Sequence, residues 1–177
     1  MTPMAMVRRA ASAGVIGAFL AVITTASLSM VDASAANCGD TNNCTADTFA
    51  DAILTSINAP DTSVNRQAFE AWEDAEGGNW QNSASCNPLN TTMREPGSHS
   101  INSVGVQAYA TGFGHTCWTW GITATYQTLK INGGDTYRAI LHALRNPDST
   151  AHGQCIDLAQ AVASTPWGTG NFSAVCP

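Results

Sequence analysis

The segment RQAFEAWEDAEGG, residues 66–78, predicts an amphipathic helix that ends at its two final glycines. At about 100° of rotation per residue, Phe69, Trp72 and Glu76 fall on one side of this helix. A glutamate on an apolar stripe is unusual, because a surface helix normally keeps its charges on the opposite face. Glu76 is therefore the first candidate for a functional residue.

The other three acids of this helix occupy less unusual positions. Glu70 and Asp74 point away from the apolar stripe, and Glu73 lies at its border. The spacing predicts that these three side chains are solvated. Glu76 is then the one acid of the segment that shares the apolar face.

The predicted surroundings of Glu76 favour its neutral form. Partial burial disfavours a charged carboxylate, and the last turn of a helix presents partial negative charge. A carboxyl group that stays protonated near neutral pH can donate a proton to a leaving glycosidic oxygen. The alternative is a partly buried glutamate that is hydrogen-bonded to neighbouring backbone groups and has no catalytic role.

Several motifs around Glu76 occur together. They are AEGGNW (75–80), NPLNTT (87–92), SVGVQAY (103–109), GITAT (121–125), the segment 137–144 and TPWGT (165–169). The set resembles the phage and actinobacterial peptidoglycan-cleaving domains of the lysozyme-like superfamily, and it covers residues 49–169. The string EGGNW is also similar to secreted resuscitation-promoting factors of the same superfamily, but NPLNTT fits the phage-type domains better.

The resemblance implies roles for individual residues. Glu76 matches the general acid of the family, and the segment 87–92 would face it across a saccharide cleft. The implied substrate-binding residues are Asn87, Asn90, Thr91, Thr92, Tyr109 and Trp80. Trp80 and Tyr109 are included because aromatic rings stack on the apolar faces of sugars. Trp118, Trp120 and Trp167 are further candidates for the same role, but an aromatic side chain in a domain of this size more often belongs to the core. The insertion over 117–120 either lines the cleft or anchors a disulfide.

The rest of the chain predicts an α+β fold in which helices dominate. Helical spacing covers 48–56, 122–131, 137–144 and 154–163, with Thr45 or Asp47 as cap of the first helix, and Ser63 or Asn65 as cap of the helix over 66–76. Short strands over 89–92 and 103–109 would form a small hairpin with its tip at 94–100. We expect a lysozyme-like domain with this hairpin as an insertion.

The first 35 residues have the features of a secretory signal peptide. Arg8 and Arg9 precede an uncharged apolar run, and Ala33-Ser34-Ala35 supplies a small-x-small cleavage site. An uncleaved membrane anchor is the alternative. We therefore expect a signal peptide over 1–35, an N-terminal arm over 36–47 and one catalytic domain over 48–177, secreted and free of the membrane after cleavage.

The charge composition excludes several classes of protein. Only 11% of the residues are charged, too few for a coiled coil or for long helices rich in ion pairs. Seven basic and thirteen acidic residues give a net charge of −6, and removal of 1–35 leaves five and twelve, or −7. A nucleic-acid partner is not expected, because there is no surplus of cations to neutralise phosphates.

Six cysteines follow the signal peptide: Cys38, Cys44, Cys86, Cys117, Cys155 and Cys176. An even number in a secreted chain predicts three disulfides, whose pairing the sequence does not determine. A bridge between Cys38 and Cys44 would close a small loop near the N-terminus. The alternative is a metal site at His115 and Cys117 or at His152 and Cys155, although there is no C-x-x-C pair. We expect no metal and no cofactor.

The mechanism depends on whether a second carboxylate is present. Glycoside hydrolases normally use two, and the sequence offers only Glu95, on the predicted hairpin tip, where a solvated surface side chain is the expectation. Hydrolysis and lytic transglycosylation therefore both stay open. We predict a monomeric enzyme that cleaves the β-1,4 backbone of peptidoglycan strands, and the alternative is a non-catalytic module that binds cell wall or saccharide.

Overall fold

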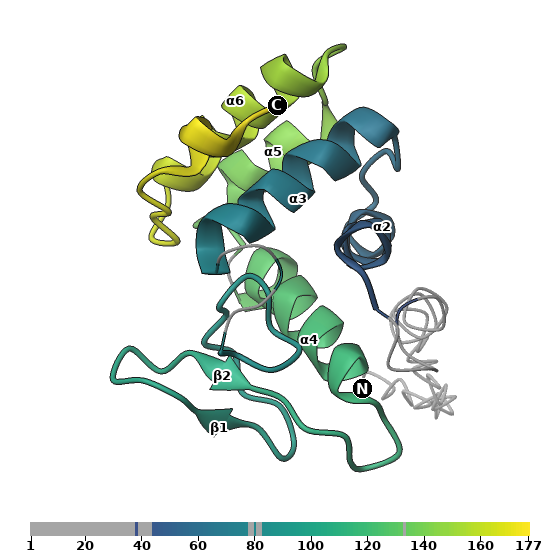
Figure 1. Ribbon diagram of the computed structural model, residues 1–177, viewed down its shortest axis with the longest axis vertical. Coiled ribbons are helices and arrows are strands. Elements are labelled where there is room, and N and C mark those ends of the chain that lie inside the picture. Colours follow the sequence, from purple (N-terminus) through teal and green to yellow (C-terminus); the bar gives the residue numbers. More distant parts are fainter. Residues whose placement is uncertain (1–37, 39–43, 78–79, 81–82, 133) are drawn as a thin grey trace, which may run out of the picture.

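The computed structural model describes residues 38, 44–77, 80, 83–132 and 134–177. These residues form five α-helices and a two-stranded antiparallel sheet, which confirms the mostly helical fold (Figure 1). In chain order the elements are α2 (Ala46–Ser56), α3 (Ser63–Gly77), β1 (His99–Ser100), β2 (Gln107–Ala108), α4 (Cys117–Tyr126), the π-helix η1 (Gln127–Asn132), α5 (Arg138–Arg145), α6 (Ala151–Ala163) and the 3₁₀-helix η2 (Phe172–Val175). The predicted signal peptide and most of the predicted N-terminal arm lie outside the described residues.

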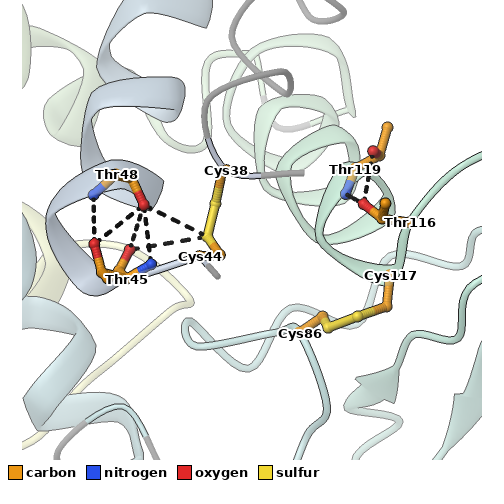
Figure 2. Close-up of a disulfide and its surroundings, with 8 residues drawn as sticks. All are labelled: Cys38, Cys44, Thr45, Thr48, Cys86, Thr116, Cys117 and Thr119. Carbon is orange, nitrogen blue, oxygen red and sulfur yellow. Dashed lines mark hydrogen bonds between the residues drawn. A yellow bond between two sulfur atoms is a disulfide. The ribbon is translucent and has the colours of Figure 1, made fainter. Parts of the chain in front are cut away.

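Helix α2 begins at Ala46, two residues before the predicted start, because Thr45 caps it. The Thr45 hydroxyl accepts a hydrogen bond from the Thr48 N–H (3.3 Å), and the Thr48 hydroxyl accepts one from the Thr45 N–H (2.9 Å). This reciprocal pair is a capping box, which Figure 2 shows beside the first disulfide. The last two residues assigned to the N-terminal arm therefore belong to the helix.

Helix α3 begins at Ser63, three residues before the predicted start at Arg66. The predicted caps, Ser63 and Asn65, are wrong, because the Thr62 hydroxyl accepts the hydrogen bond from the Asn65 N–H (3.2 Å). Asn65 is buried, and its side-chain amide donates to the main-chain oxygen of Leu144 at the end of α5 (2.7 Å). The start of α3 is thus fixed by a contact with a distant part of the chain.

The later helices confirm the spacing and change the boundaries. Residues 117–132 form one continuous helical segment, α4 followed by η1, which starts five residues before the predicted 122. Thr116 caps α4 and Thr150 caps α6, each by accepting a hydrogen bond from the N–H three residues later. The capping hydroxyls therefore set where these helices begin.

Helix α3 lies at the centre of the molecule, with α5 and α6 on one side and α4 on the other (Figure 1). It packs against α2 and α6, and its apolar face supplies Phe69 and Trp72 to the core. The ring of Phe69 contacts that of Phe49 from α2 (6.4 Å between centroids), and Trp72 is stacked near Phe172 of η2 (6.4 Å). The sheet lies at one end of the molecule, beside α4.

The small hairpin exists, but its strands differ from the prediction. β1 pairs with β2 in the register His99 with Ala108 and Ser100 with Gln107. The predicted strand over 89–92 is wrong, and the partner strand lies within the predicted tip. The reason is conformational: Asn90 has φ of +53°, in the left-handed region that a strand residue does not adopt.

Three disulfides confirm the predicted number. They join Cys38 to Cys44, Cys86 to Cys117 and Cys155 to Cys176. Figure 2 shows the first beside α2 and the second at the start of α4. Because Cys117 and Cys155 are oxidised, neither can supply a thiolate to the alternative metal sites. No helix in the described part of the chain is long and apolar enough to cross a membrane.

Helix α4 approaches the chain at Cys86 so closely that only glycine fits at position 121. A Cβ atom there would overlap the main-chain oxygen of Cys86. Gly121→Ala is therefore expected to lower the free energy of unfolding by about 1–3 kcal/mol, measured by urea denaturation. Gly134→Ala is the control, since no non-neighbouring atom of the described residues lies within 4 Å of a Cβ at that site. Equal stability of the two variants would contradict the close contact.

Candidate functional site

Glu76 lies in the last turn of α3, and its half-buried side chain lines a cleft of about 360 Å³. This volume is within the usual range for small-molecule binding sites. The cleft walls come from four other parts of the chain: Asn90, Thr91 and Thr92; Val104 and Val106; Thr128 and Tyr137; Pro166 and Trp167. The end of α3, the β1–β2 turn and the C-terminal loop therefore meet around one carboxyl group.

The environment of Glu76 raises its pKa, as predicted. Burial is the main cause, and hydrogen bonds from the side chains of Thr169 and Asn90 act in the opposite direction. The Thr169 hydroxyl donates to Glu76 Oε1. The Asn90 amide also donates to the main-chain oxygen of Glu76 (2.5 Å), which fixes the end of the helix against the cleft.

Asn87 does not reach the cleft, although the sequence placed it among the substrate-binding residues. It is 1% exposed, and its side chain spans the turn that follows it. Its Oδ1 accepts a hydrogen bond from the Thr91 N–H (2.9 Å), and its Nδ2 donates to the main-chain oxygens of Thr91 (2.9 Å) and Gln107 (2.7 Å). Asn87 is thus a positioning residue that presents Asn90, Thr91 and Thr92 to the cleft.

Tyr109 has a similar supporting place. It is 2% exposed, and its hydroxyl donates to the main-chain oxygen of Met93 (2.8 Å) and lies 2.9 Å from the Thr91 hydroxyl. Burial raises the pKa of its phenol. The predicted stacking of a sugar ring on Tyr109 is not supported, because its ring is enclosed by the protein.

Trp80 is also away from the cleft lining that the structure describes. Its ring stacks on Trp118 of α4, with 4.9 Å between centroids and 5° between planes, and its edge contacts Phe49 (5.8 Å). These contacts between aromatic side chains join Trp80 to α2 and α4. Trp80 therefore packs against the core, and its predicted contact with a sugar stays a prediction.

Trp167 is the tryptophan among the described residues that line the cleft, whereas Trp80 and Tyr109 were the aromatic residues predicted for this role. Its indole N–H donates to the main-chain oxygen of Leu89 (3.2 Å), and its ring lies edge-on to Trp72 (4.8 Å) and Tyr137 (5.4 Å). The motif TPWGT was the available signal, because it belongs to the set that carries the family resemblance.

Glu95 is not the solvated residue that was expected. It is half-buried, and burial raises its pKa. Its Oε1 is enclosed and has no hydrogen-bond partner among the described residues, and its charge raises the pKa of the nearby Tyr109. Among the described residues that line the cleft, however, Glu76 is the only carboxylate.

Glu73 departs most from expectation, because it is 1% exposed where a solvated side chain was predicted. It lies one turn beyond Phe69, and the packing of α3 covers that border of the apolar stripe. Neither carboxyl oxygen has a hydrogen-bond partner within the described residues. Burial, together with the charges of Glu70 and Asp74, raises the pKa of Glu73 well above its ordinary value.

Comparisons of the chain with protein-family models, with curated proteins and with solved structures found no match. The resemblance to lysozyme-like domains therefore stays a prediction based on the motifs. The geometry of the cleft is the independent observation on which a function can be proposed. No cluster of three or more metal-binding side chains occurs in the part of the chain that the structure describes.

Proposed function

We propose that this protein is a secreted glycosidase that cleaves the β-1,4 backbone of peptidoglycan, with Glu76 as the general acid. The observation that carries the proposal is the half-buried carboxyl of Glu76, with raised pKa, on the wall of an open cleft. The motifs of the lysozyme-like superfamily support the choice of substrate. Three disulfides agree with secretion, because such bonds persist in oxidising compartments.

The reaction begins when Glu76 transfers its proton to the glycosidic oxygen and the bond from that oxygen to C1 breaks. The resulting carboxylate can then act as a base. With one carboxylate on the described cleft wall, ring closure by the 6-hydroxyl of the same sugar is favoured: its oxygen bonds to C1 and its proton returns to Glu76. Hydrolysis requires a water molecule in place of that hydroxyl.

The remaining cleft residues are suited to hold a saccharide. Asn90 and Thr92 offer an amide and a hydroxyl to sugar hydroxyl groups, whereas the buried Thr91 hydroxyl is already bonded to Asn87 Oδ1 (3.1 Å) and lies 2.9 Å from the Tyr109 hydroxyl. All three residues belong to a turn fixed by Asn87. On another wall, Trp167 offers an aromatic surface. This combination of an apolar ring with fixed polar groups is typical of ligand sites that orient their substrate.

Digestion of purified cell walls tests the proposal directly. Residues 36–177 are incubated with the walls, and the released fragments are analysed by mass spectrometry. Anhydro ends are expected, and reducing ends would instead establish hydrolysis. A protein that sediments with the walls but releases no fragment would be the non-catalytic binding module, and the proposed activity would be wrong.

Thr169→Val is expected to move the alkaline limb of the pH–rate profile upward. The Thr169 hydroxyl donates to Glu76 and lowers its pKa, so its loss raises the pKa and keeps the acid protonated at higher pH. Fragment release is measured between pH 4 and pH 9. Thr92→Val is the control, because Thr92 lines the cleft but is not among the groups that shift the pKa of Glu76. A downward shift in Thr169→Val would contradict the contact.

A further inference from the structure

The segment between β2 and α4 carries an exposed phenylalanine in an unusual backbone conformation. Phe113 is 75% exposed and has φ of +56°, and the next residue, Gly114, has φ of +82°. Gly112 and His115 close the turn with two backbone hydrogen bonds (3.0 and 3.1 Å). Positive φ at both central residues is the pattern of a type I′ turn, which strongly favours asparagine followed by glycine. Phenylalanine at the first position raises the free energy of the folded backbone, and such strained residues are often found at functional sites.

The turn is held rigidly from the side of α4. The Cys86–Cys117 disulfide anchors the first residue of α4 (Figure 2), and the Cys117 N–H donates to the Thr111 hydroxyl (3.3 Å). The indole N–H of Trp120 donates to the main-chain oxygen of Gly112 (3.4 Å). The protein therefore fixes the backbone of the turn from which the Phe113 side chain projects.

A second aromatic group lies beside the turn. The half-buried ring of Trp120 contacts the His115 ring edge-on, with 4.7 Å between centroids. The Phe113 ring contacts the chain at Gly97, because a Cβ atom built on Gly97 would lie 3.4 Å from that ring. We call this group of three residues the aromatic turn site. It combines the phenyl ring of Phe113, the imidazole of His115 and the indole of Trp120.

The turn belongs to a long stretch of sequence without charged side chains, and the charged residues nearest to it on the side of Gly97 are the oppositely charged pair Arg94 and Glu95. Residues 96–129 contain no aspartate, glutamate, lysine or arginine, in a chain whose net charge is −6. Phosphate groups of nucleic acids or anionic lipids are recognised mainly by lysine and arginine, which this region lacks. A neutral polymer with apolar faces and many hydroxyl groups fits an uncharged aromatic surface better.

The aromatic turn site is separate from the cleft. In Figure 1 the turn between β1 and β2, which contains the cleft residue Val104, is at the left end of the hairpin. The segment from β2 to α4 runs along the opposite, right-hand side. The aromatic turn site and the cleft therefore lie toward opposite ends of the hairpin.

We propose that the aromatic turn site is a second carbohydrate-binding site, which holds a neutral stretch of a β-linked glycan through the rings of Phe113 and Trp120. The choice of a glycan rests on the proposed function, whereas the site itself rests on the geometry of the turn. Phe113→Asn tests it cleanly, because asparagine suits the first position of this turn and removes only the ring. Its thermal midpoint is expected to equal or exceed that of the parent.

The probe is a neutral hexamer of β-1,4-linked N-acetylglucosamine, titrated into Glu76→Gln protein and followed by amide chemical shifts. Shifts are expected at two sets of residues, at the cleft and at 111–120. Phe113→Asn is expected to weaken binding at 111–120 at least tenfold and to leave the cleft set unchanged. Ile131→Ala is the control. It also removes an exposed apolar side chain (61% exposed), but from η1, and it should leave binding at 111–120 unchanged.

The outcomes separate the two proposals. Unchanged affinity at 111–120 in Phe113→Asn, shifts confined to the cleft, or no binding of the hexamer at all would overturn the second site. Binding to phosphatidylcholine vesicles without binding of the hexamer would also overturn it and would identify a lipid surface as the ligand. Ring-dependent binding at 111–120 in a protein that releases nothing from cell walls would support the site while removing the proposed catalytic function.

Discussion

Glu76→Gln is expected to lower the rate of fragment release from cell walls by roughly 10²–10⁴-fold, the usual contribution of a general acid. Glutamine keeps the length and the oxygen that accepts from Thr169, but its amide cannot give up a proton to a leaving oxygen. Binding of cell wall should be retained, because the cleft walls are unchanged. The release rate is measured by mass spectrometry of soluble fragments under the conditions used for the wild type.

Glu95→Gln is the matched control for this experiment. Glu95 is the other half-buried glutamate near the sheet, and burial raises its pKa as well, but it lies outside the described cleft lining. Its variant should release fragments at a rate within a few-fold of the wild type. If Glu95→Gln abolished release while Glu76→Gln did not, the general acid would be Glu95 and the assignment from the cleft would be wrong.

The sequence predicts the helices of this protein well because their apolar periodicity is local. Helix α3 appears from the spacing of Phe69 and Trp72, and both side chains are buried as expected. The first residues of the helices were predicted less accurately, because they depend on which hydroxyl group caps each helix. Thr62 caps α3 although two later polar residues looked equally suitable.

The hairpin shows why short strands are harder to predict. The segment 89–92 has the composition of a strand, but the Asn87 side chain satisfies the backbone of Thr91 and the main-chain oxygen of Gln107. Residues 87 and 107 are far apart in sequence. The main-chain oxygen of Thr91 also accepts a hydrogen bond from the Gln107 N–H (3.0 Å), so the two predicted segments do lie side by side, but the Asn87 amide and the positive φ of Asn90 replace a regular ladder. No local pattern predicts this arrangement or the actual pairing of β1 with β2.

In the candidate site, too, the sequence predicts the residue that depends on local spacing and not the one that depends on long-range packing. Glu76 was predicted because it is an acidic residue on the apolar face of a helix, a feature that two helical turns of sequence are enough to detect. Which tryptophan lines the cleft depends on long-range packing: Trp80 stacks on Trp118, whereas Trp167 is brought to the cleft by the C-terminal loop. Residue type alone could not distinguish these two side chains.

Glu73→Gln is expected to stabilise the protein, and the gain should grow as the pH rises. Burial and the charges of Glu70 and Asp74 raise the pKa of Glu73 well above that of the unfolded chain, which is about 4.3. A group whose pKa is raised by folding contributes stability below the unfolded pKa, and that contribution is lost as the pH rises through the folded pKa. Glutamine does not titrate, so the variant avoids the loss.

At pH 4 the wild type and Glu73→Gln should unfold at similar urea concentrations, because a protonated carboxyl and an amide have similar polarity. At pH 8 the variant should be more stable by about 1–3 kcal/mol, the usual cost of a buried polar group without a partner. Asp74→Asn removes the same charge from an exposed neighbour and should change the stability by less than about 0.5 kcal/mol. A gain in Glu73→Gln that does not depend on pH would mean that folding does not raise the pKa of Glu73. A loss of stability at pH 8 would show that its carboxylate is paired, against the burial seen in α3.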